Sequence, residues 1–245
     1  MKLELCAYSL EDCLTAAAEG FHQVELCASP ADGGTTPSGG LVKLVKEKIA
    51  LHINVMIRPR GGDFLYSDSE IEVMKADILL MKALGVKGIV LGVLQADGQV
   101  DKALLSELVE LAAPLEVVFH RAFDLALDPA QALEDIIEAG CKRLLTSGQA
   151  LTAQAGIDVI EQLVKQAQGR IEIMVGSGVS SENVALFKAV GVTCFHTSGR
   201  AYRESAMDYR KEGMVLTDFE GISDYQKRFA DASKLQKMRL QVDLA

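Results

Sequence analysis

The sequence has no apolar run approaching the roughly 20 residues that a membrane-spanning helix needs. Its first residues, MKLELC, carry charged side chains where a secretory leader would have an apolar stretch. The five cysteines include no CxxC pair, and a chain of 245 residues does not need disulfides to fold. These absences predict a cytoplasmic protein with reduced cysteines and no membrane partner.

Basic residues are too few to suggest a nucleic-acid partner. The chain has 25 lysines and arginines against 34 acidic residues, a net charge of −9, whereas a nucleic-acid-binding domain presents a basic face. The composition is 49% hydrophobic with no low-complexity tract, which is typical of a globular protein with a sizeable core. Two small domains could share this length, but α/β barrels commonly use it for one.

Short β-rich runs alternate with longer segments of helical period. Two of these helical segments are 69–85 and 128–140, the second with Asp128 as N-cap, Pro129 at the first helical position and Gly140 as the stop. Eight strands, each followed by a helix and with no linker, predict an α/β fold, a single-domain (β/α)₈ TIM-like barrel. A doubly wound open sheet, the alternative, would need fewer strands or a clear switch point. The expected strands begin at Leu3, His22, His52, Gly88, Leu115, Lys142, Ile171 and Val192.

The chain divides at about residue 200. Residues 1–200 are expected to form the barrel core, and residues 201–245 a C-terminal helical extension that completes the same domain. Whether this extension makes contacts in a homo-oligomer is left open.

Alternation within the strands predicts which side chains point into the barrel. Successive strand residues point to opposite faces, and the outward ones, packed under helices, should be apolar. In the first strand Leu3 and Leu5 therefore point outward, which leaves Glu4 and Cys6 inside. The same rule gives an unusually polar interior, and buried charges are costly unless they are paired or used. The expected inward side chains are Glu4, Cys6, Gln23, Glu25, Cys27, His52, Asn54, Met56, Arg58, Glu116, Val118, His120, Glu172, Met174, Cys194 and His196.

The stretch MIRPRGGDFLYS, residues 56–67, follows the third expected strand. Active sites of TIM barrels form at the carboxyl ends of the strands, so this loop should face the barrel mouth. Arginine binds carboxylates and phosphates through paired hydrogen bonds, which makes Arg58 and Arg60, with Asp63 beside them, candidates for substrate or anion binding. In the alternative, both arginines pair with carboxylates of the protein and only stiffen the mouth.

Glycine-rich turns follow the last two expected strands, in VGSGVS (175–180) and HTSGR (196–200). Backbone N–H groups of such turns can bind anions, and TIM barrels often hold phosphate at this place. Tight turns that simply require small residues are the alternative. Together with LTSGQ (145–149), the turns supply the remaining anion-binding candidates: Thr146, Ser147, Gly176, Ser177, Gly178, His196 and Ser198.

Proton transfer would need a titratable group at the same mouth. HRAFD (120–124) offers His120 as a general base or a metal ligand, with Asp124 to orient it, and Glu25 points inward from the second strand. These three are the catalytic candidates. The alternative is a structural histidine that is hydrogen-bonded to Asp124.

Cys6 and Cys27 lie on adjacent expected strands, both pointing inward at matching depth. Adjacent strands lie about 4.8 Å apart, so the two sulfurs could share one metal ion. Two thiolates suit a soft ion such as Cu(I) better than magnesium or calcium. The alternative is that both are ordinary small core residues.

The chain resembles the CutC family, which is named for copper homeostasis. The most specific combination is MIRPRGGDF (56–64), FHRAFD (119–124) and LTSGQ (145–149). Further motifs extend the resemblance over about the first 200 residues: LELC (3–6), VELC (24–27), GGTTPS (33–38), MKADI (74–78), DGQVD (97–101), IMVGSGV (173–179) and FHTSG (195–199). The resemblance implies a cytosolic TIM-like barrel associated with copper tolerance and Cu(I) binding, with Cys6 and Cys27 as candidate metal ligands.

Two functional hypotheses follow. In the first, the protein binds Cu(I) through Cys6 and Cys27 inside the barrel mouth. In the second, it is an enzyme acting on a small anionic metabolite, a phosphate or a carboxylate, held by Arg58 and the glycine-rich turns. Whether the protein is an enzyme stays open at this point.

Overall fold

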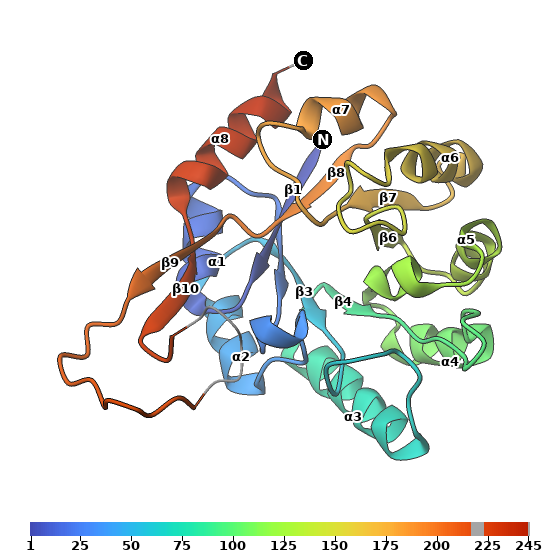
Figure 1. Ribbon diagram of the computed structural model, residues 1–245. Helices are drawn as coiled ribbons and strands as arrows, with labels where there is room; N and C mark the ends of the chain where they lie inside the picture. The colour runs from blue at the N-terminus through green and yellow to red at the C-terminus, as the bar shows by residue number, and fades with distance from the viewer. Residues whose placement is uncertain (217–222, 245) are drawn as a thin grey trace.

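Eight parallel strands close into a barrel in the order β1 to β8, with β8 paired back to β1 (Figure 1). The computed structural model describes residues 1–216 and 223–244. Each strand begins within two residues of its predicted start, and the prediction of a single-domain (β/α)₈ barrel is confirmed. The strands are β1 (Lys2–Ala7), β2 (Gln23–Leu26), β3 (His52–Met56), β4 (Gly88–Leu91), β5 (Glu116–Phe119), β6 (Arg143–Thr146), β7 (Glu172–Val175) and β8 (Cys194–Thr197).

Helices surround the barrel and return the chain to the start of the next strand (Figure 1). None of those that the structure describes is long and apolar enough to cross a bilayer. They are α1 (Leu10–Ala18), α2 (Gly39–Lys48), α3 (Asp68–Leu84), α4 (Lys102–Ala112), α5 (Pro129–Glu138), α6 (Ile157–Ala167), α7 (Val184–Ala189) and α8 (Ala232–Asp243), with short 3₁₀ turns η1 (Pro30–Asp32) and η2 (Arg121–Leu125).

Local sequence signals explain where helices begin. The Asp128 carboxylate accepts hydrogen bonds from the N–H groups of Ala130 and Gln131, so the predicted N-cap of α5 is confirmed. Ser67 and Glu70 form a capping box at the start of α3, in which each side chain accepts from the other's backbone N–H. This capping box fixes the residue at which the MIRPRGGDFLYS loop ends and α3 begins.

The strands separate two layers of buried side chains. Outward residues such as Leu3, Leu5 and Val24 pack with the helices in an apolar layer. The inner layer is small and mixed, and it contains Cys6, Cys27, Met56, Val90, Val118, Leu145, Met174 and Cys194 with the buried polar side chains Glu4, Gln23, Glu25, Asn54 and Arg143. The predicted alternation, with Cys6 and Glu25 inside the barrel, is therefore confirmed.

Paired polar side chains occupy the amino-terminal end of the barrel interior. Arg143 Nε donates to Glu172 Oε2 at 2.6 Å, and Lys2 reaches the same oxygen at 3.1 Å. His52 Nε2 lies 3.0 Å from Asn54 Oδ1. This end of the interior is thus filled and cross-linked, which leaves the carboxyl ends of the strands as the open side.

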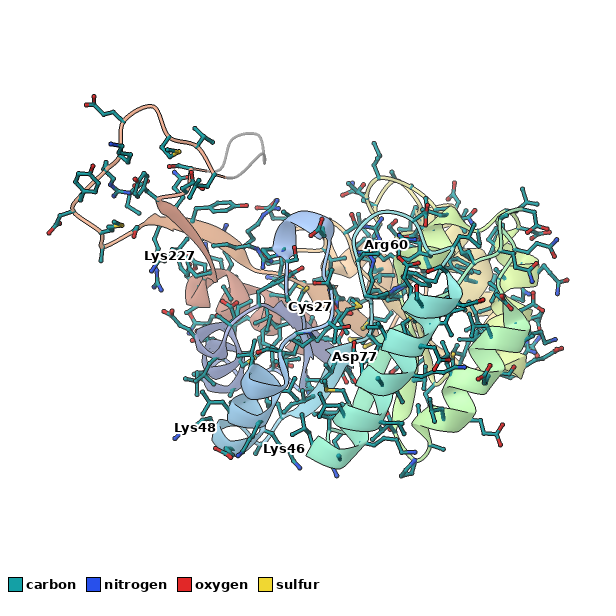
Figure 2. All side chains as sticks on the ribbon, turned by 90° about the horizontal axis from the view of Figure 1, so that it is seen from below. Cys27, Lys46, Lys48, Arg60, Asp77 and Lys227 are labelled. Carbon is teal, nitrogen blue, oxygen red and sulfur yellow. The ribbon has the colours of Figure 1, made fainter. Side chains whose placement is uncertain are left out.

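A two-stranded antiparallel hairpin and a final helix follow β8. The hairpin consists of β9 (Arg200–Glu204) and β10 (Gln226–Ala230), and it precedes α8 in the segment for which the sequence predicted only helix. The helix α8 packs beside α1 and α7, and Leu235 and Met238 belong to the apolar layer (Figure 1). The hairpin lies at the same end of the barrel as Arg60, whereas Lys46 and Lys48, near the end of α2, lie at the opposite end (Figure 2).

Candidate functional site

A cavity of about 590 Å³ opens at the carboxyl ends of the strands. This is the size of a typical small-molecule site and the place where TIM barrels carry their active sites. Its floor includes Cys6, Glu25 and His196, and its walls include Met56, Arg58, Phe64, His120 and Leu145. The outer part is lined by Tyr8, Arg121, Ser177, Gly178, Val179, Ser198, Arg200, Tyr202, Gln226 and Arg228.

Two cysteines and a glutamate meet at the floor. Cys6 Sγ lies 3.4 Å and Cys27 Sγ 3.5 Å from the same oxygen, Glu25 Oε2. In the strand register Cys6 is opposite Glu25, and Cys27 follows two residues later toward the mouth, so the two cysteines are not at matching depth as the sequence suggested. Cys6 lines the cavity, whereas Cys27 is fully buried among the inner side chains (Figure 2).

Gly34 covers Cys27 and needs to be glycine. Its φ of +103° lies in the left-handed region that favours glycine, and a Cβ there would lie 3.2 Å from Cys27 Sγ. The loop after β2 can therefore close directly over the sulfur. This packing explains why Cys27 does not reach the cavity surface.

A chain of hydrogen bonds runs from the floor into the interior. His196 Nδ1 lies 2.8 Å from Glu4 Oε1, and Asn54 donates to Glu4 Oε2 at 2.8 Å. The other ring nitrogen of His196 lies 3.7 Å from Glu25 Oε2. Glu4, which is fully buried, thus fixes the ring so that Nε2 faces the floor of the cavity.

Burial and mutual contacts shift the pKa values of Cys6, Glu25 and His196 in different ways. A hydrogen bond with Cys27 outweighs burial and, with His196, holds the pKa of the Cys6 thiol well below its usual value. Burial raises the pKa of Glu25 well above its usual value. Burial alone would lower the pKa of His196, but Glu25 and the hydrogen bonds to Cys6 and Glu4 raise it well above its usual value. The arrangement favours a Cys6 thiolate beside a charged imidazole and a protonated Glu25.

Three ligand atoms at this floor could hold a metal ion. Those of Cys6, Glu25 and His196 all lie within 4.8 Å of one another. The sequence assigned these residues to three different roles, as metal ligand, catalytic group and anion-binding group, and the structure brings them together at one point. The signal that could have joined them is their shared inward parity on β1, β2 and β8, which are neighbours in the closed barrel.

Arg58 holds the loops of the cavity wall together. Its two terminal nitrogens donate to the backbone carbonyls of Asp32, Gly34 and Gly62 at 2.6–2.9 Å. The guanidinium also lies over the ring of Phe64, 4.9 Å from the centroid. One nitrogen, Nε, is buried without a hydrogen-bond partner among the described residues.

Arg60 and Asp63 lie outside the cavity lining. Arg60 Nε donates to Glu70 at 2.6 Å, and a terminal nitrogen donates to Asp63 at 3.0 Å. Because Glu70 belongs to the capping box of α3, Arg60 ties the loop to the start of that helix. Figure 2 shows Arg60 above α3 and away from Cys27. This geometry agrees with the alternative in which Arg60 pairs with carboxylates of the protein and only stiffens the barrel mouth.

Asp124 is not bonded to His120. Its carboxylate accepts hydrogen bonds from Thr146 Oγ1, from the backbone N–H and hydroxyl of Ser147, from the N–H of Gln149 and from Arg121 Nε, at 2.5–3.1 Å. It therefore joins η2 to the loop after β6. Thr146 and Ser147, two of the predicted anion-binding residues, are bonded to it and do not line the cavity.

His120 lines the cavity as a neutral ring. Its Nδ1 accepts from the N–H of Ala122 at 3.2 Å, and its buried Nε2 has no partner in the part of the chain that the structure describes. Burial, and then the charge of Arg58, lower its pKa to about 3. With Nδ1 accepting, the proton sits on Nε2, which makes His120 a hydrogen-bond donor toward the cavity.

Acid is expected to destabilise the wild-type protein through His120. Unfolding returns the pKa from about 3 to 6.5, so the unfolded state binds more protons and stability falls as pH drops below 6.5. Between pH 7.5 and 5 this contribution is about 2 kcal/mol. Urea unfolding at both pH values should show that wild type loses about 2 kcal/mol more than His120→Gln. Parallel pH curves for the two proteins would contradict it.

The glycine-rich turns contribute only part of their predicted residues to the cavity. Ser177, Gly178 and Ser198 line it, whereas the N–H of Gly176 is bonded to the Thr146 carbonyl at 3.0 Å. The sequence did not single out Tyr8, Phe64, Arg200 and Arg228, which also line it. Phe64 belongs to the loop 56–67, so its place at the mouth could have been predicted. Nothing in the sequence pattern of the C-terminal segment indicated that this segment would fold back to the mouth.

The chain matches the model of the CutC family over residues 1–201. It is 45% identical to a family protein CutC of Chromobacterium violaceum, over 99% of this chain and 98% of that protein. It is 43% identical to a human protein named copper homeostasis protein cutC homolog, over 96% of this chain and 87% of that protein.

A solved structure gives the same picture of the fold. The crystal structure of CutC from Streptococcus agalactiae superposes with a TM-score of 0.77 at 35% identity, covering 80% of this chain and 97% of that one. Other barrels, such as a phosphoribosyl anthranilate isomerase of Thermus thermophilus at 12% identity and a TM-score of 0.56, share the fold alone.

Proposed function

The chain belongs to the CutC family, and we propose that it serves copper homeostasis in the cytoplasm by binding Cu(I) at the floor of the barrel mouth. The observation that carries the proposal is the cluster of Cys6, Glu25 and His196, whose ligand atoms lie within 4.8 Å of one another. Relatives named for copper homeostasis support the choice of metal.

The donor set fits a soft ion. Cys6 offers a thiolate, His196 an imidazole nitrogen after it gives up its proton, and Cys27 a second sulfur beside Glu25. Burial raises the pKa of Glu25, which disfavours the charged carboxylate that magnesium or calcium would need as a ligand. We therefore assign Cys6 and His196 as the primary ligands, with Cys27 behind them.

Stoichiometry and ligand type test this proposal. The wild-type protein should retain one Cu(I) per chain against a chromogenic Cu(I) chelator under anaerobic conditions. X-ray absorption at the copper edge should show sulfur together with a nitrogen ligand. Copper bound by nitrogen and oxygen alone, or no retention at all, would contradict the proposal.

A second candidate function is the binding or conversion of a small anionic metabolite in the same cavity. A buried donor favours it, because His120 Nε2 lacks a partner among the described residues although His120 lines the cavity. Buried polar groups are almost always hydrogen-bonded, so such a donor suits a ligand acceptor. Glu25, with its raised pKa, would be the proton donor of an enzymatic step.

We further propose that residues 201–245 complete the barrel domain. Leu235, Met238 and Val242 of α8 are buried with the apolar layer. The N–H of Ala230 also donates to Asp12 Oδ1, while Asp12 Oδ2 accepts from the N–H of Tyr8. Asp12 thereby joins the end of the hairpin to the loop after β1, beside the cavity.

A further inference from the structure

The β9–β10 hairpin presents one of its two faces to the cavity. Arg200 and Tyr202 of β9, and Gln226 and Arg228 of β10, line it. Alternation along each strand explains the set, because residues two apart share a face, and the antiparallel register places Arg228 opposite Tyr202. The hairpin is therefore part of the cavity wall.

The opposite face of the hairpin makes different contacts. Arg203 donates to both oxygens of Glu11 in α1, at 2.9 and 2.6 Å, and lies over the ring of Phe229. Lys227 also belongs to this face, and it projects away from the barrel interior where Cys27 lies (Figure 2). These contacts hold the hairpin against α1 and do not involve Arg200 or Arg228.

The cavity has a strong excess of positive charge. Among the described residues, four arginines line it, Arg58, Arg121, Arg200 and Arg228, against a single carboxyl group, Glu25. The whole chain carries a net charge of −9, so the excess is local to this site. An anionic ligand would be attracted to it.

Among the described residues, Arg200 and Arg228 have no carboxylate partner, and neither has Arg58, whose terminal nitrogens donate to backbone carbonyls. Within residues 1–216 and 223–244, Arg121 pairs with Asp124, whereas neither Arg200 nor Arg228 forms an ion pair. Arg228 lies over the ring of Tyr8, 4.1 Å from the centroid, which holds its guanidinium beside the mouth. Unpaired guanidinium groups on a cavity wall are suited to a carboxylate or a phosphate.

We propose that Arg200 and Arg228 form an anion subsite, so that the cavity takes a small organic ligand with a carboxylate or phosphate group at the hairpin. His120 Nε2, buried and without a partner among the described residues, donates to a second acceptor group of the same ligand. The subsite rests on the second candidate function and names the ligand class and the selecting residues. It adds the hairpin to a site that the barrel loops alone would not complete.

Calorimetric titration of the full chain at low ionic strength tests the subsite. The probes are inorganic phosphate and the dicarboxylates malonate, succinate and glutarate at millimolar concentration. Arg228→Gln and Arg200→Gln should each weaken binding of the best probe by about 10-fold or more, the scale of a lost hydrogen bond between charged groups. Lys227→Gln removes the same charge from the other face of the hairpin and should leave the affinity unchanged.

The outcomes separate this inference from the function on which it rests. Equal losses in Arg228→Gln and Lys227→Gln would overturn the subsite, since only net charge would then matter. Binding that depends on His120→Gln but not on Arg200 or Arg228 would also overturn it while leaving the second candidate function intact. No saturable binding of any probe by wild type would remove both. Arg228→Lys, which keeps the charge, should recover part of the affinity if Arg228→Gln is impaired for lack of a cation.

Discussion

Replacing Cys6 by serine is expected to weaken Cu(I) binding by at least about 100-fold. Loss of a residue that only hydrogen-bonds to a metal ligand already lowers metal affinity by about 10- to 100-fold, and loss of the ligand itself should cost more. Cys6 is the sulfur that lines the cavity, and a pKa held well below the usual thiol value by Cys27 and His196 favours its thiolate. A serine hydroxyl stays protonated and is a hard donor. Anaerobic competition with a chromogenic chelator at pH 7.5 measures the change.

Substitution of the two cysteines by serine is expected to lower the Cu(I) affinity by different amounts. Cys27 is fully buried under Gly34, and burial raises its pKa, so Cys27→Ser should cost less, about 10-fold. Cys13, equally buried but on α1 in the apolar layer, gives the matched control, and Cys13→Ser should keep wild-type affinity. An unchanged affinity in Cys6→Ser, or a larger loss in Cys27→Ser, would show that the ligands are assigned wrongly.

The polar barrel interior could be predicted because strand geometry has a period of two. Once Leu3 and Leu5 are placed under helices, Glu4 and Cys6 can only point inward. The same argument on β2 and β8 gave Glu25 and His196. The existence of the floor therefore followed from the amino-acid order within single strands.

The register between strands could not be predicted in the same way. Closing a barrel requires a stagger between neighbouring strands, and the stagger is set by packing of all eight. The sequence therefore placed Cys6 and Cys27 at matching depth, whereas in the register Cys6 is opposite Glu25. That shift of two residues brings Glu25 to Cys6 and His196, so that the ligand atoms of these three residues lie within 4.8 Å of one another.

Contacts between distant segments decided the remaining differences. Arg60 turns away from the cavity because Glu70, ten residues later, accepts from it at the start of α3. The hairpin strands RAYRE and QKRFA carry charges on both faces, so their alternation is hidden in the sequence. Their cavity-facing residues emerge only when β9 and β10 pair across more than 20 intervening residues.

Replacing Asp124 by alanine is expected to cost about 3–5 kcal/mol of unfolding free energy, because several buried donors lose their acceptor at once and each costs about 1–3 kcal/mol. The Asp124 side chain is only 7% exposed, and its loss would leave the N–H groups of Ser147 and Gln149 and the Thr146 hydroxyl without their acceptor. Urea unfolding at pH 7.5 measures the change. Asp124→Asn, which keeps one oxygen acceptor, should fall between wild type and alanine.

Asp63 provides the control for that measurement. It was a candidate of the same mouth, but its side chain is 72% exposed and its ion pair with Arg60 is a surface contact, so Asp63→Ala should cost less than about 1 kcal/mol. A near-neutral Asp124→Ala that instead loses anion binding would make Asp124 a positioning residue of the site. A large loss of stability in Asp124→Ala, with anion affinity retained in the folded Asp124→Asn, assigns Asp124 to the framework. His120, to which it makes no hydrogen bond, then acts at the cavity wall without it.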